Sequence, residues 1–455
     1  MDVLTPAHQT AAVVPAWNEV ESIGPVVSGL LAAGACCVFV VDPGSADGTG
    51  TVAAKAGATV ISEHRPGYGR ACMSGAEAAM ASGHSVVAFL DGDGSCDPSQ
   101  LSALLLVLKR SGADLVLGSR SGEQGAIAWH ARAGNSLVTA FLRARTGTGI
   151  RDLPPFKVIR ADALSCLNIS EPGYGWTVQL VARSLVHPVL RQIESPTDFS
   201  VRSGGVSKVS GQLGPSLRAG AAMLREAWGG SRRRGLLMLM AKAPRSGHSK
   251  TRIQNELGAE AATEFWTACL GDSGEFLRRA AAQLGLDIAA MAPTEQDAVS
   301  VRRLTGLPTL VQKAPGLGNA LYEVTTLPAP FTIAISADVP HLPLDRIERA
   351  ARAMARHGSV VGPGVDGGYY LVGLRRGFSE VRRRRAFLEA SMGTAGVLEH
   401  TAGALGNPRL LEAWPDLDTV ADVDSFTAEM AAGALGAPRL ARWAARRPGT
   451  RREAV

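Results

Sequence analysis

Two apolar runs typical of buried strands end in carboxylates. The run 85–90 leads into Asp91-Gly92-Asp93, and the run 331–335 leads into Ser336-Ala337-Asp338. Carboxylates at the carboxyl end of a central strand lie where open α/β sheets bind their ligands. Asp91 and Asp93 are one residue apart and can hold a hard divalent cation, Mg²⁺ or Mn²⁺, that also holds a diphosphate. The sequence therefore predicts a nucleotide-handling site in each half of the chain.

Alternating strands and helices are expected to position these carboxylates. In the first half the predicted strands are 11–15, 38–41, 60–62, 86–90 and 115–117, and the predicted helices are 19–33, 47–56, 69–82 and 100–110. Alternation at this spacing favours a doubly wound, mostly parallel sheet in an α/β fold.

The alternation breaks at the glycine- and arginine-rich stretch that ends at Gly235, and a new apolar run begins at Leu236. We therefore predict a first domain over 1–228, a linker over 229–235 and a second domain over 236–455 with a basic C-terminal tail. We find no short-period repeat, so a duplication would be one of architecture.

Composition narrows the function classes. The 455 residues carry a net charge of +6, which fits anionic ligands, but the arginine clusters lack the interleaved aromatic residues that would favour nucleic acid. The six cysteines show no CxxC and no metal-ligand spacing, and we expect them to be buried small hydrophobes in a reducing cytosol.

Neither a signal peptide nor an apolar run of about 20 residues is visible, so we expect a cytoplasmic protein. An amphipathic stretch over 213–228 leaves two alternatives: it rests on a membrane surface, or it packs on the domain core. Membrane contact is at most peripheral.

Several ordered motifs of the first half resemble family 2 glycosyltransferases, most closely the dolichyl-phosphate mannosyltransferase-like branch with the GT-A fold. The resemblance runs from about residue 11 to 210. Its motifs are Val13-Val14-Pro15-Ala16-Trp17-Asn18-Glu19, Val41-Asp42-Pro43-Gly44-Ser45, Arg65-Pro66-Gly67-Tyr68-Gly69, Asp91-Gly92-Asp93, Gly118-Ser119-Arg120, Tyr174-Gly175-Trp176-Thr177 and Gly204-Gly205-Val206-Ser207-Lys208.

This resemblance implies a nucleoside-diphosphate sugar as donor and assigns roles by position. Asp91 and Asp93 would place the metal ion and, with Arg202 and Lys208 holding phosphate on the acceptor side, form the catalytic set. The residues expected to bind the nucleotide are Pro15, Asn18, Glu19, Asp42 and Gly69. Structural alternatives stay open: Asp47 before Thr49 could be only a helix N-cap, and Trp17 and Trp176 could be wall or core.

Two departures from the family pattern bear on the acceptor. Pro43 stands where the family usually has a second aspartate, and Gln179 stands where the branch commonly has a glutamate. A hydroxyl acceptor generally needs a carboxylate base, whereas a phosphate or carboxylate is already a nucleophile. Gln179 therefore favours an anionic acceptor, either a small molecule or a lipid phosphate, although Glu171 and Asp152 lie in nearby segments.

The second half resembles an uncharacterised GT-A-like family akin to 2-phospholactate guanylyltransferase, over about 236–424. The motifs are the basic loop 240–252, Ser336-Ala337-Asp338, Val365-Asp366-Gly367-Gly368 and Asp416-Leu417-Asp418. The resemblance implies that Asp338 and Asp366 share a magnesium ion. The basic residues expected to hold nucleotide phosphates are Lys242, Arg245, Lys250 and Arg252. A Gly-Asp-Leu-Gly-x-Arg segment common in the family is absent around 314–320.

Three hypotheses follow for the whole chain. The first is a metal-dependent inverting glycosyltransferase in the first half, bifunctional with a second transferase domain. The second makes nucleotidyl transfer from a nucleoside triphosphate, in the second half, the principal reaction. The third makes the second half a degenerate binding or assembly module. We favour the first, with two tandem GT-A-like (Rossmann-like) domains.

Overall fold

The computed structural model describes residues 10–122, 129–202, 213–245, 250–394, 396–431 and 436–446. The chain divides into two compact units, Met1–Arg232 and Arg233–Val455. The division falls inside the segment 229–235 that was expected as a linker, and the first two residues of that segment end a helix. Each unit is described by itself.

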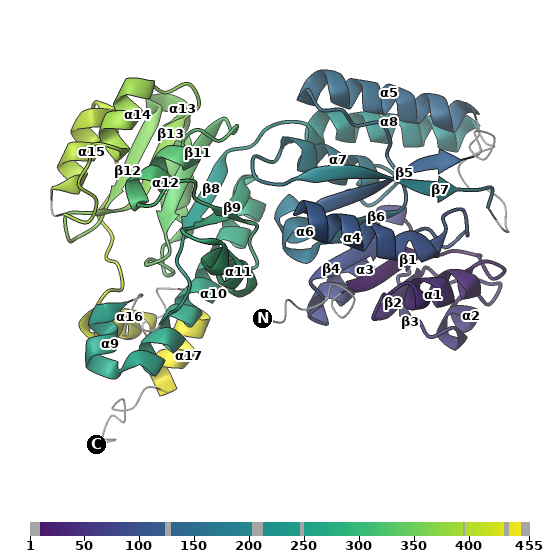
Figure 1. The fold of residues 1–455 in the computed structure, drawn as a ribbon, viewed down its shortest axis with the longest axis horizontal. Helices are drawn as coiled ribbons and strands as arrows, with labels where there is room; N and C mark the ends of the chain where they lie inside the picture. Colours follow the sequence, from purple (N-terminus) through teal and green to yellow (C-terminus); the bar gives the residue numbers. More distant parts are fainter. Residues whose placement is uncertain are drawn as a thin grey trace. The chain divides into compact units, whose positions relative to one another are not determined.

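A seven-stranded sheet forms the centre of the first unit (Figure 1). Its strand order is β3-β2-β1-β4-β6-β5-β7, and β6 runs antiparallel to both of its neighbours. The strands are β1 (Thr10–Pro15), β2 (Cys37–Asp42), β3 (Thr59–Ser62), β4 (Val86–Phe89), β5 (Leu115–Gly122), β6 (Lys157–Arg160) and β7 (Gln192–Phe199).

Helices cover both faces of this sheet. They are α1 (Ile23–Ala32), α2 (Thr49–Lys55), α3 (Tyr68–Ala81), α4 (Leu101–Ser111), α5 (Trp129–Thr146), α6 (Ala161–Leu167), α7 (Trp176–Val186) and α8 (Leu213–Gly230), with the short 3₁₀ helix η2 (Pro98–Gln100).

The two faces have separate cores because successive strand residues point to opposite sides. Ala11 and Val13 of β1 pack with α3, α6 and α7, whereas Ala12 and Val14 pack with α1, α2 and α4. Helix α8 packs against α7 and lies beside α5 (Figure 1), and its Ala227 is fully buried. The amphipathic stretch over 213–228 is thus part of a helix that packs on its own domain.

The second unit contains another seven-stranded sheet, with the order β10-β9-β8-β11-β13-β12-β14. Strand β13 is antiparallel to both of its neighbours. The strands are β8 (Leu236–Met240), β9 (Asp287–Ala292), β10 (Thr309–Val311), β11 (Phe331–Ser336), β12 (Ser359–Pro363), β13 (Tyr369–Arg375) and β14 (Arg409–Leu410).

The helices of the second unit are α9 (Thr251–Leu257), α10 (Ala259–Leu284), α11 (Glu295–Thr305), α12 (Leu317–Val324), α13 (Leu344–His357), α14 (Glu380–Phe387), α15 (Val397–Leu405), α16 (Val420–Ala431) and α17 (Pro438–Arg446). Helix α10 packs against α11 and α17.

Counted within each unit, the two strand orders are the same. Both read 3-2-1-4-6-5-7, with the sixth strand reversed. Two candidate site carboxylates follow corresponding strands: Asp91 comes after β4, and Asp338 comes after β11. The fold class predicted from the sequence, two tandem mostly parallel α/β sheets flanked by helices, is confirmed.

Candidate functional site

A pocket of about 740 Å³ lies at the edge of the first sheet where β1, β2 and β4 end. This is the edge at which α/β sheets bind ligands. The pocket is lined by Pro15, Ala16, Trp17, Glu19, Val41, Pro43, Gly44, Glu63, His64, Arg65, Pro66, Gly67, Tyr68, Ala71, Asp91, Gly92, Asp93, Gly173, Tyr174 and Arg202.

Asp91 lines this pocket and is largely shielded from water. Its Oδ1 accepts a hydrogen bond of 2.9 Å from the Tyr68 hydroxyl. Burial, followed by repulsion from Asp93, raises the pKa of Asp91 to about 6, although Lys157 and Tyr68 act in the opposite direction. An ionised Asp91 is therefore costly unless a cation comes close to it.

Asp93 lies in a more polar setting. Its Oδ1 accepts hydrogen bonds from the backbone N–H of Ser95 at 3.0 Å and from the Ser95 hydroxyl at 2.7 Å. Its Oδ2 is 2.7 Å from Nη2 of Arg202. Desolvation opposes ionisation, but the bonds from Arg202 and Ser95 outweigh it and lower the pKa of Asp93.

Two neighbouring carboxylates with pKa values shifted apart are typical of a functional site. The oxygen atoms of Asp91 and Asp93 are hard ligands that fit Mg²⁺ or Mn²⁺. A bound cation would also offset the repulsion between the two carboxylates that arises when Asp91 loses its proton. Arg202 now supplies positive charge there. Its Nη2 also lies 3.8 Å from Oε1 of Glu19, while its Nη1 is buried and has no hydrogen-bond partner among the residues that the structure describes.

A buried lysine near Asp91, Lys157, was not predicted from the sequence to belong to the site. Lys157 of β6 is completely buried, donates to the Thr177 hydroxyl at 3.2 Å, and has its ammonium over the Phe89 and Trp176 rings. Burial lowers its pKa, and nearby Asp91 opposes that shift. A lysine in an otherwise apolar strand could have been the signal, because an amine is buried in the core only with a partner.

Glu19, Asn18 and Asp42 take different positions around the pocket. Glu19 lines it, and its backbone N–H donates to the Thr49 hydroxyl at 2.8 Å. Asn18, with φ +52°, lies outside the lining and accepts from the backbone of Ala46 at 3.1 Å. Oδ1 of Asp42 accepts from the backbone of Gly44 and Ser45, which holds the loop after β2 in shape. A nucleotide-binding role for these three residues stays a prediction.

Pro15 lines the pocket, but Gly69 is not among the residues that line it. A Cβ atom on Gly69 would come within 2.1 Å of the Glu171 carbonyl oxygen, so this glycine allows α3 to pack closely on the loop before α7. Asp47 precedes Gly48, the N-cap residue of α2, and accepts hydrogen bonds from the backbone and hydroxyl of Thr49 and from the backbone of Val20. Lys208 lies outside the described residues.

Gln179, the residue that argued for an anionic acceptor, is structural in its contacts. Its Oε1 accepts from the backbone N–H of Ser170 at 2.7 Å and of Glu171 at 3.1 Å, and its Nε2 donates to Glu226 of α8 at 2.7 Å. The alternative carboxylates are engaged as well. Asp152 forms a two-pronged pair with Arg120, and Glu171 lies 3.2 Å from Nη2 of Arg225.

A second pocket, of about 670 Å³, lies at the matching edge of the other sheet. Lys250 is the central residue: its Nζ lies 2.5 Å from Oδ1 of Asp338 and 2.6 Å from Oδ1 of Asp418, and it donates to the Leu417 carbonyl at 2.8 Å. The two carboxylates raise the pKa of Lys250 against the effect of burial. The ammonium is therefore held by protein carboxylates, whereas the expectation was that it would hold phosphates.

Of the other residues predicted for this site, some line the pocket and one is held in a salt bridge outside its lining. Lys242 and Arg252 line the pocket, while Arg245 lies 3.2 Å from Asp297. Asp366 accepts from the backbone of Gly368 at 2.9 Å. Its sharing of a magnesium ion with Asp338 stays a prediction.

Asp416, to which the sequence analysis gave no role, belongs to the same group of carboxylates. Burial, then Asp418, Asp366 and Asp338, raise the pKa of Asp416 to about 6. The donor set of oxygen atoms fits a hard cation, with Lys250 supplying the positive charge there.

The expectation that all six cysteines are buried is wrong for two of them. Cys36 is exposed and Cys37 is half-buried, whereas Cys72, Cys96, Cys166 and Cys269 are buried. Cys36 lies in the bend that precedes β2, where the chain is still at the surface of the sheet.

Comparison with known proteins identifies the first half. Residues 11–167 match the model of glycosyl transferase family 2. An uncharacterised glycosyltransferase of Mycobacterium bovis is 39% identical over 208 residues, which cover 46% of this chain and 92% of that protein. The chain belongs to glycosyltransferase family 2. The polyprenol monophosphomannose synthase of Mycolicibacterium smegmatis is 31% identical, with 45% of this chain and 83% of that protein covered.

Other matches are more distant. Residues 275–394 match a family described as an uncharacterised protein conserved in bacteria (DUF2064). A crystal structure of glucosyl-3-phosphoglycerate synthase from Mycobacterium tuberculosis with Mn²⁺, UDP-glucose and phosphoglyceric acid is 22% identical, with a TM-score of 0.41, and covers 49% of this chain and 82% of that one. Both resemblances noted in the sequence, to family 2 and to an uncharacterised family, are confirmed, and the family 2 domain makes the protein a transferase. Among the described residues, no helix is both long and apolar enough to cross a bilayer.

Proposed function

We propose that the family 2 domain is a metal-dependent, inverting glycosyltransferase that moves a sugar from a nucleoside-diphosphate donor to an anionic acceptor. The observation that carries the proposal is the pair Asp91 and Asp93, whose pKa values are shifted in opposite directions on the wall of one pocket. A structural turn would not need two desolvated carboxylates side by side.

Asp91 and Asp93 would hold Mg²⁺ or Mn²⁺, which when bound neutralises charge on the departing nucleoside diphosphate. Arg202, now paired with Asp93, supplies a second positive charge on the same wall. Glu19 lines the pocket close enough to the pair to accept hydrogen bonds from the donor. Asp42 shapes the loop after β2, whose Pro43 and Gly44 face the pocket.

Transfer in this scheme breaks the bond between the anomeric carbon and the diphosphate oxygen and forms a bond from that carbon to an acceptor oxygen on the opposite face. An anionic oxygen needs no base to remove a proton, which agrees with the engagement of Gln179, Asp152 and Glu171 in structural contacts. In this proposal Arg202 and Lys208 bind the phosphate group of the acceptor.

The names of two relatives support a phosphate-bearing acceptor. One is the polyprenol monophosphomannose synthase already described, and the other is an undecaprenyl-phosphate mannosyltransferase of Micrococcus luteus, 32% identical over 87% of that protein. We therefore propose a polyprenyl phosphate or a smaller phosphate-bearing molecule, which share the chemistry that an arginine and a lysine recognise.

A second candidate function belongs to the other unit. Asp338, Asp366, Asp416 and Asp418 lie near one another around Lys250 at the edge where β11 ends. This collection of carboxylates supports nucleotidyl transfer from a nucleoside triphosphate, with Asp338 and Asp366 as the proposed magnesium ligands and Lys242 and Arg252 on the pocket wall for phosphate.

The test is transfer of labelled sugar by the full chain from UDP-, GDP- and dTDP-sugars to polyprenyl phosphate or to small phosphorylated acceptors, with Mn²⁺ or Mg²⁺. Asp93→Asn should lower the rate by at least about 100-fold, comparable with loss of one contact that stabilises the transition state. Asp97→Asn is the matched control, because Asp97 caps η2 outside this pocket and should keep its rate. Wild-type rates in Asp93→Asn would refute the assignment.

The same variants separate the two candidate functions. Asp338→Asn should leave sugar transfer intact and abolish pyrophosphate release from a nucleoside triphosphate, if the second unit performs nucleotidyl transfer. Pyrophosphate release that depends on Asp93 and survives Asp338→Asn would contradict that second function.

A further inference from the structure

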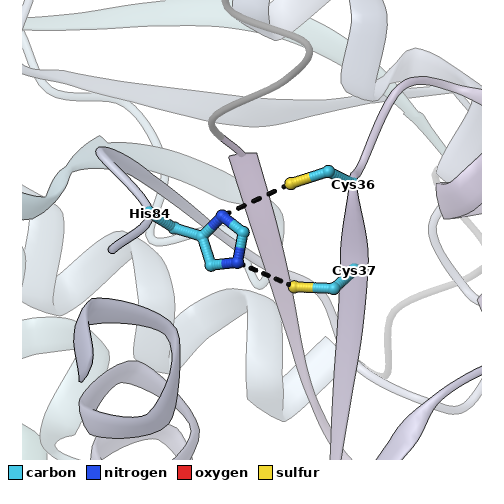
Figure 2. Close-up of side chains that lie close together, drawn as sticks. All are labelled: Cys36, Cys37 and His84. Carbon is cyan, nitrogen blue, oxygen red and sulfur yellow. Dashed lines mark hydrogen bonds between the residues drawn. The ribbon is translucent and has the colours of Figure 1, made fainter. Parts of the chain in front are cut away.

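Two adjacent cysteines and a histidine meet at the opposite edge of the first sheet, where its strands begin (Figure 2). Cys36 and Cys37 stand at the start of β2, and His84 stands two residues before β4. Strand β1 lies between them, since Ala11 pairs with Cys37 and Thr10 pairs with Val86. Three chain segments that are distant in sequence thus meet at one place, away from the edge that carries Asp91.

The bend at Cys36 explains why adjacent thiols reach one imidazole. In a regular strand neighbouring side chains point to opposite faces. Cys36 precedes the first residue of β2, and its backbone N–H donates to the Thr10 carbonyl at 2.9 Å. The turned backbone directs both sulfur atoms toward His84, as Figure 2 shows.

Three possible ligand atoms lie close together here. Sγ of Cys36 lies 3.3 Å from Nδ1 of His84, and Sγ of Cys37 lies 3.2 Å from Nε2. The three candidate ligand atoms all lie within 4.8 Å of one another. Tetrahedral zinc with bonds of about 2.3 Å to sulfur and about 2.0 Å to nitrogen separates its ligand atoms by about 3.5–3.8 Å. The sulfur atoms now contact different nitrogens of the ring, so binding one ion would require the imidazole to turn a single nitrogen toward both of them.

Without metal, one pattern of protons satisfies the cluster. The Cys37 thiol donates to Nε2 of His84, Nδ1–H donates to Sγ of Cys36, and the Cys36 thiol donates to the Thr10 carbonyl at 2.9 Å. Burial, together with the neighbouring Cys36, raises the pKa of Cys37 to about 11. A metal ion must therefore displace thiol protons, which favours thiophilic cations over Mg²⁺ and Mn²⁺.

We propose that Cys36, Cys37 and His84 form a binding site for a thiophilic divalent cation, Zn²⁺ being the representative, with a fourth position for water on the exposed side of Cys36. The ion would link the start of β2 to the segment before β4, and the start of β1 lies between these two segments. It would stabilise the sheet and take no part in sugar transfer, because the donor pocket lies at the other ends of these strands.

The first test is the zinc content of the full chain after gel filtration in a reducing buffer. We expect about one Zn²⁺ per chain for the wild type and at least a tenfold weaker affinity for Cys37→Ser and for His84→Ala. Matched controls are Cys166→Ala, a buried thiol of α6, and His400→Ala, an exposed imidazole of α15, which should both retain zinc. Asp93→Asn should retain zinc as well, which separates this site from the donor pocket.

A second measurement needs no variant and covers the case in which a substitution unfolds the protein. Free Cys36 is exposed and should react quickly with iodoacetamide, and stoichiometric Zn²⁺ should protect the peptide that contains Cys36 and Cys37 while Mg²⁺ does not. Co²⁺ in place of zinc should give sulfur-to-metal charge-transfer absorption. Unprotected cysteines at saturating Zn²⁺, or equal zinc retention in Cys37→Ser and Cys166→Ala, would overturn the proposal.

Discussion

The hydrogen bond from the Tyr68 hydroxyl to Asp91 is one of the contacts that set the pKa of this carboxyl group. This bond lowers the pKa of Asp91, which burial and Asp93 raise to about 6. In the proposed mechanism a cation binds only when Asp91 is deprotonated, so activity should fall as the pH drops through about 6.

Tyr68→Phe should therefore raise the pKa of Asp91 and move the acid side of the pH–rate profile to higher pH. The loss of activity relative to the wild type should be larger at pH 6 than at pH 8. Tyr174→Phe is the control, since Tyr174 stacks on Tyr68 with ring centroids 6.2 Å apart, and Asp91 receives its hydroxyl bond from Tyr68. An unchanged acid side in Tyr68→Phe would show that Asp91 does not govern the profile.

For single residues, the sequence predicted those in the loops after strands better than those buried in the strands beside them. Asp91, Asp93 and Glu19 lie in the pocket because they directly follow strands whose apolar pattern is visible. Lys157 lies 66 positions after Asp91 and reaches it only through the pairing of β6 with β4, which a single sequence does not reveal. The contacts of Lys250 with Asp338 and Asp418 were not predicted either, because they join segments that are far apart in the sequence.

Helix α3 packs closely on the sheet at a residue that has no side chain. A Cβ atom on Gly75 would lie 2.3 Å from Cγ1 of Val13 and 3.1 Å from Cγ2 of Val41, so this glycine lets α3 lie close to β1 and β2. In contrast, a Cβ atom on Gly134 in α5 would meet no described atom within 4 Å.

Alanine at these two helical glycines should have opposite effects on the free energy of unfolding. Gly75→Ala should destabilise the protein by about 1–3 kcal/mol, because the added methyl group overpacks the core. Gly134→Ala should stabilise it by about 0.5–1 kcal/mol, because alanine restricts the unfolded chain and favours the helix. Urea unfolding measures both, and destabilisation of equal size in the two variants would contradict the packing argument.

The elements themselves were largely predictable. The predicted strand 38–41 lies within β2, and the run 331–335 lies within β11, because apolar strand cores give clear patterns. The reversed β6 and β13 were not predicted, since strand direction depends on long-range pairing rather than on composition. The helical stretch over 213–228 showed an amphipathic face, but only the fold reveals that α7 covers it.

At the scale of the whole molecule, two compact units with separate sheets should unfold in two transitions. Lys250→Met should lower one transition and leave the other in place. Removal of one partner from a buried ion pair costs about 3–5 kcal/mol, and we expect the lower value because Asp338 and Asp418 remain partly in contact with water. Scanning calorimetry measures both transitions.

The same variant tests whether Asp338 and Asp418 can accept a metal ion. Without the ammonium the two carboxylates repel each other, so Mg²⁺ should restore part of the lost stability in Lys250→Met. Lys313→Met is the control, since the Lys313 side chain is 84% exposed and should change stability by less than about 0.5 kcal/mol. A Mg²⁺ effect of the same size in both variants would rule out cation binding by the pair.

The repeated strand order also bears on how the protein is made. In the described chain, every strand of the first sheet lies before residue 200, and every strand of the second lies after residue 235. A ribosome therefore releases all the hydrogen-bonding partners of the first sheet before it has translated any strand of the second. The glycosyltransferase half can finish folding on the nascent chain, while the half with Lys250 forms its own strand pairings only after its later strands have been translated.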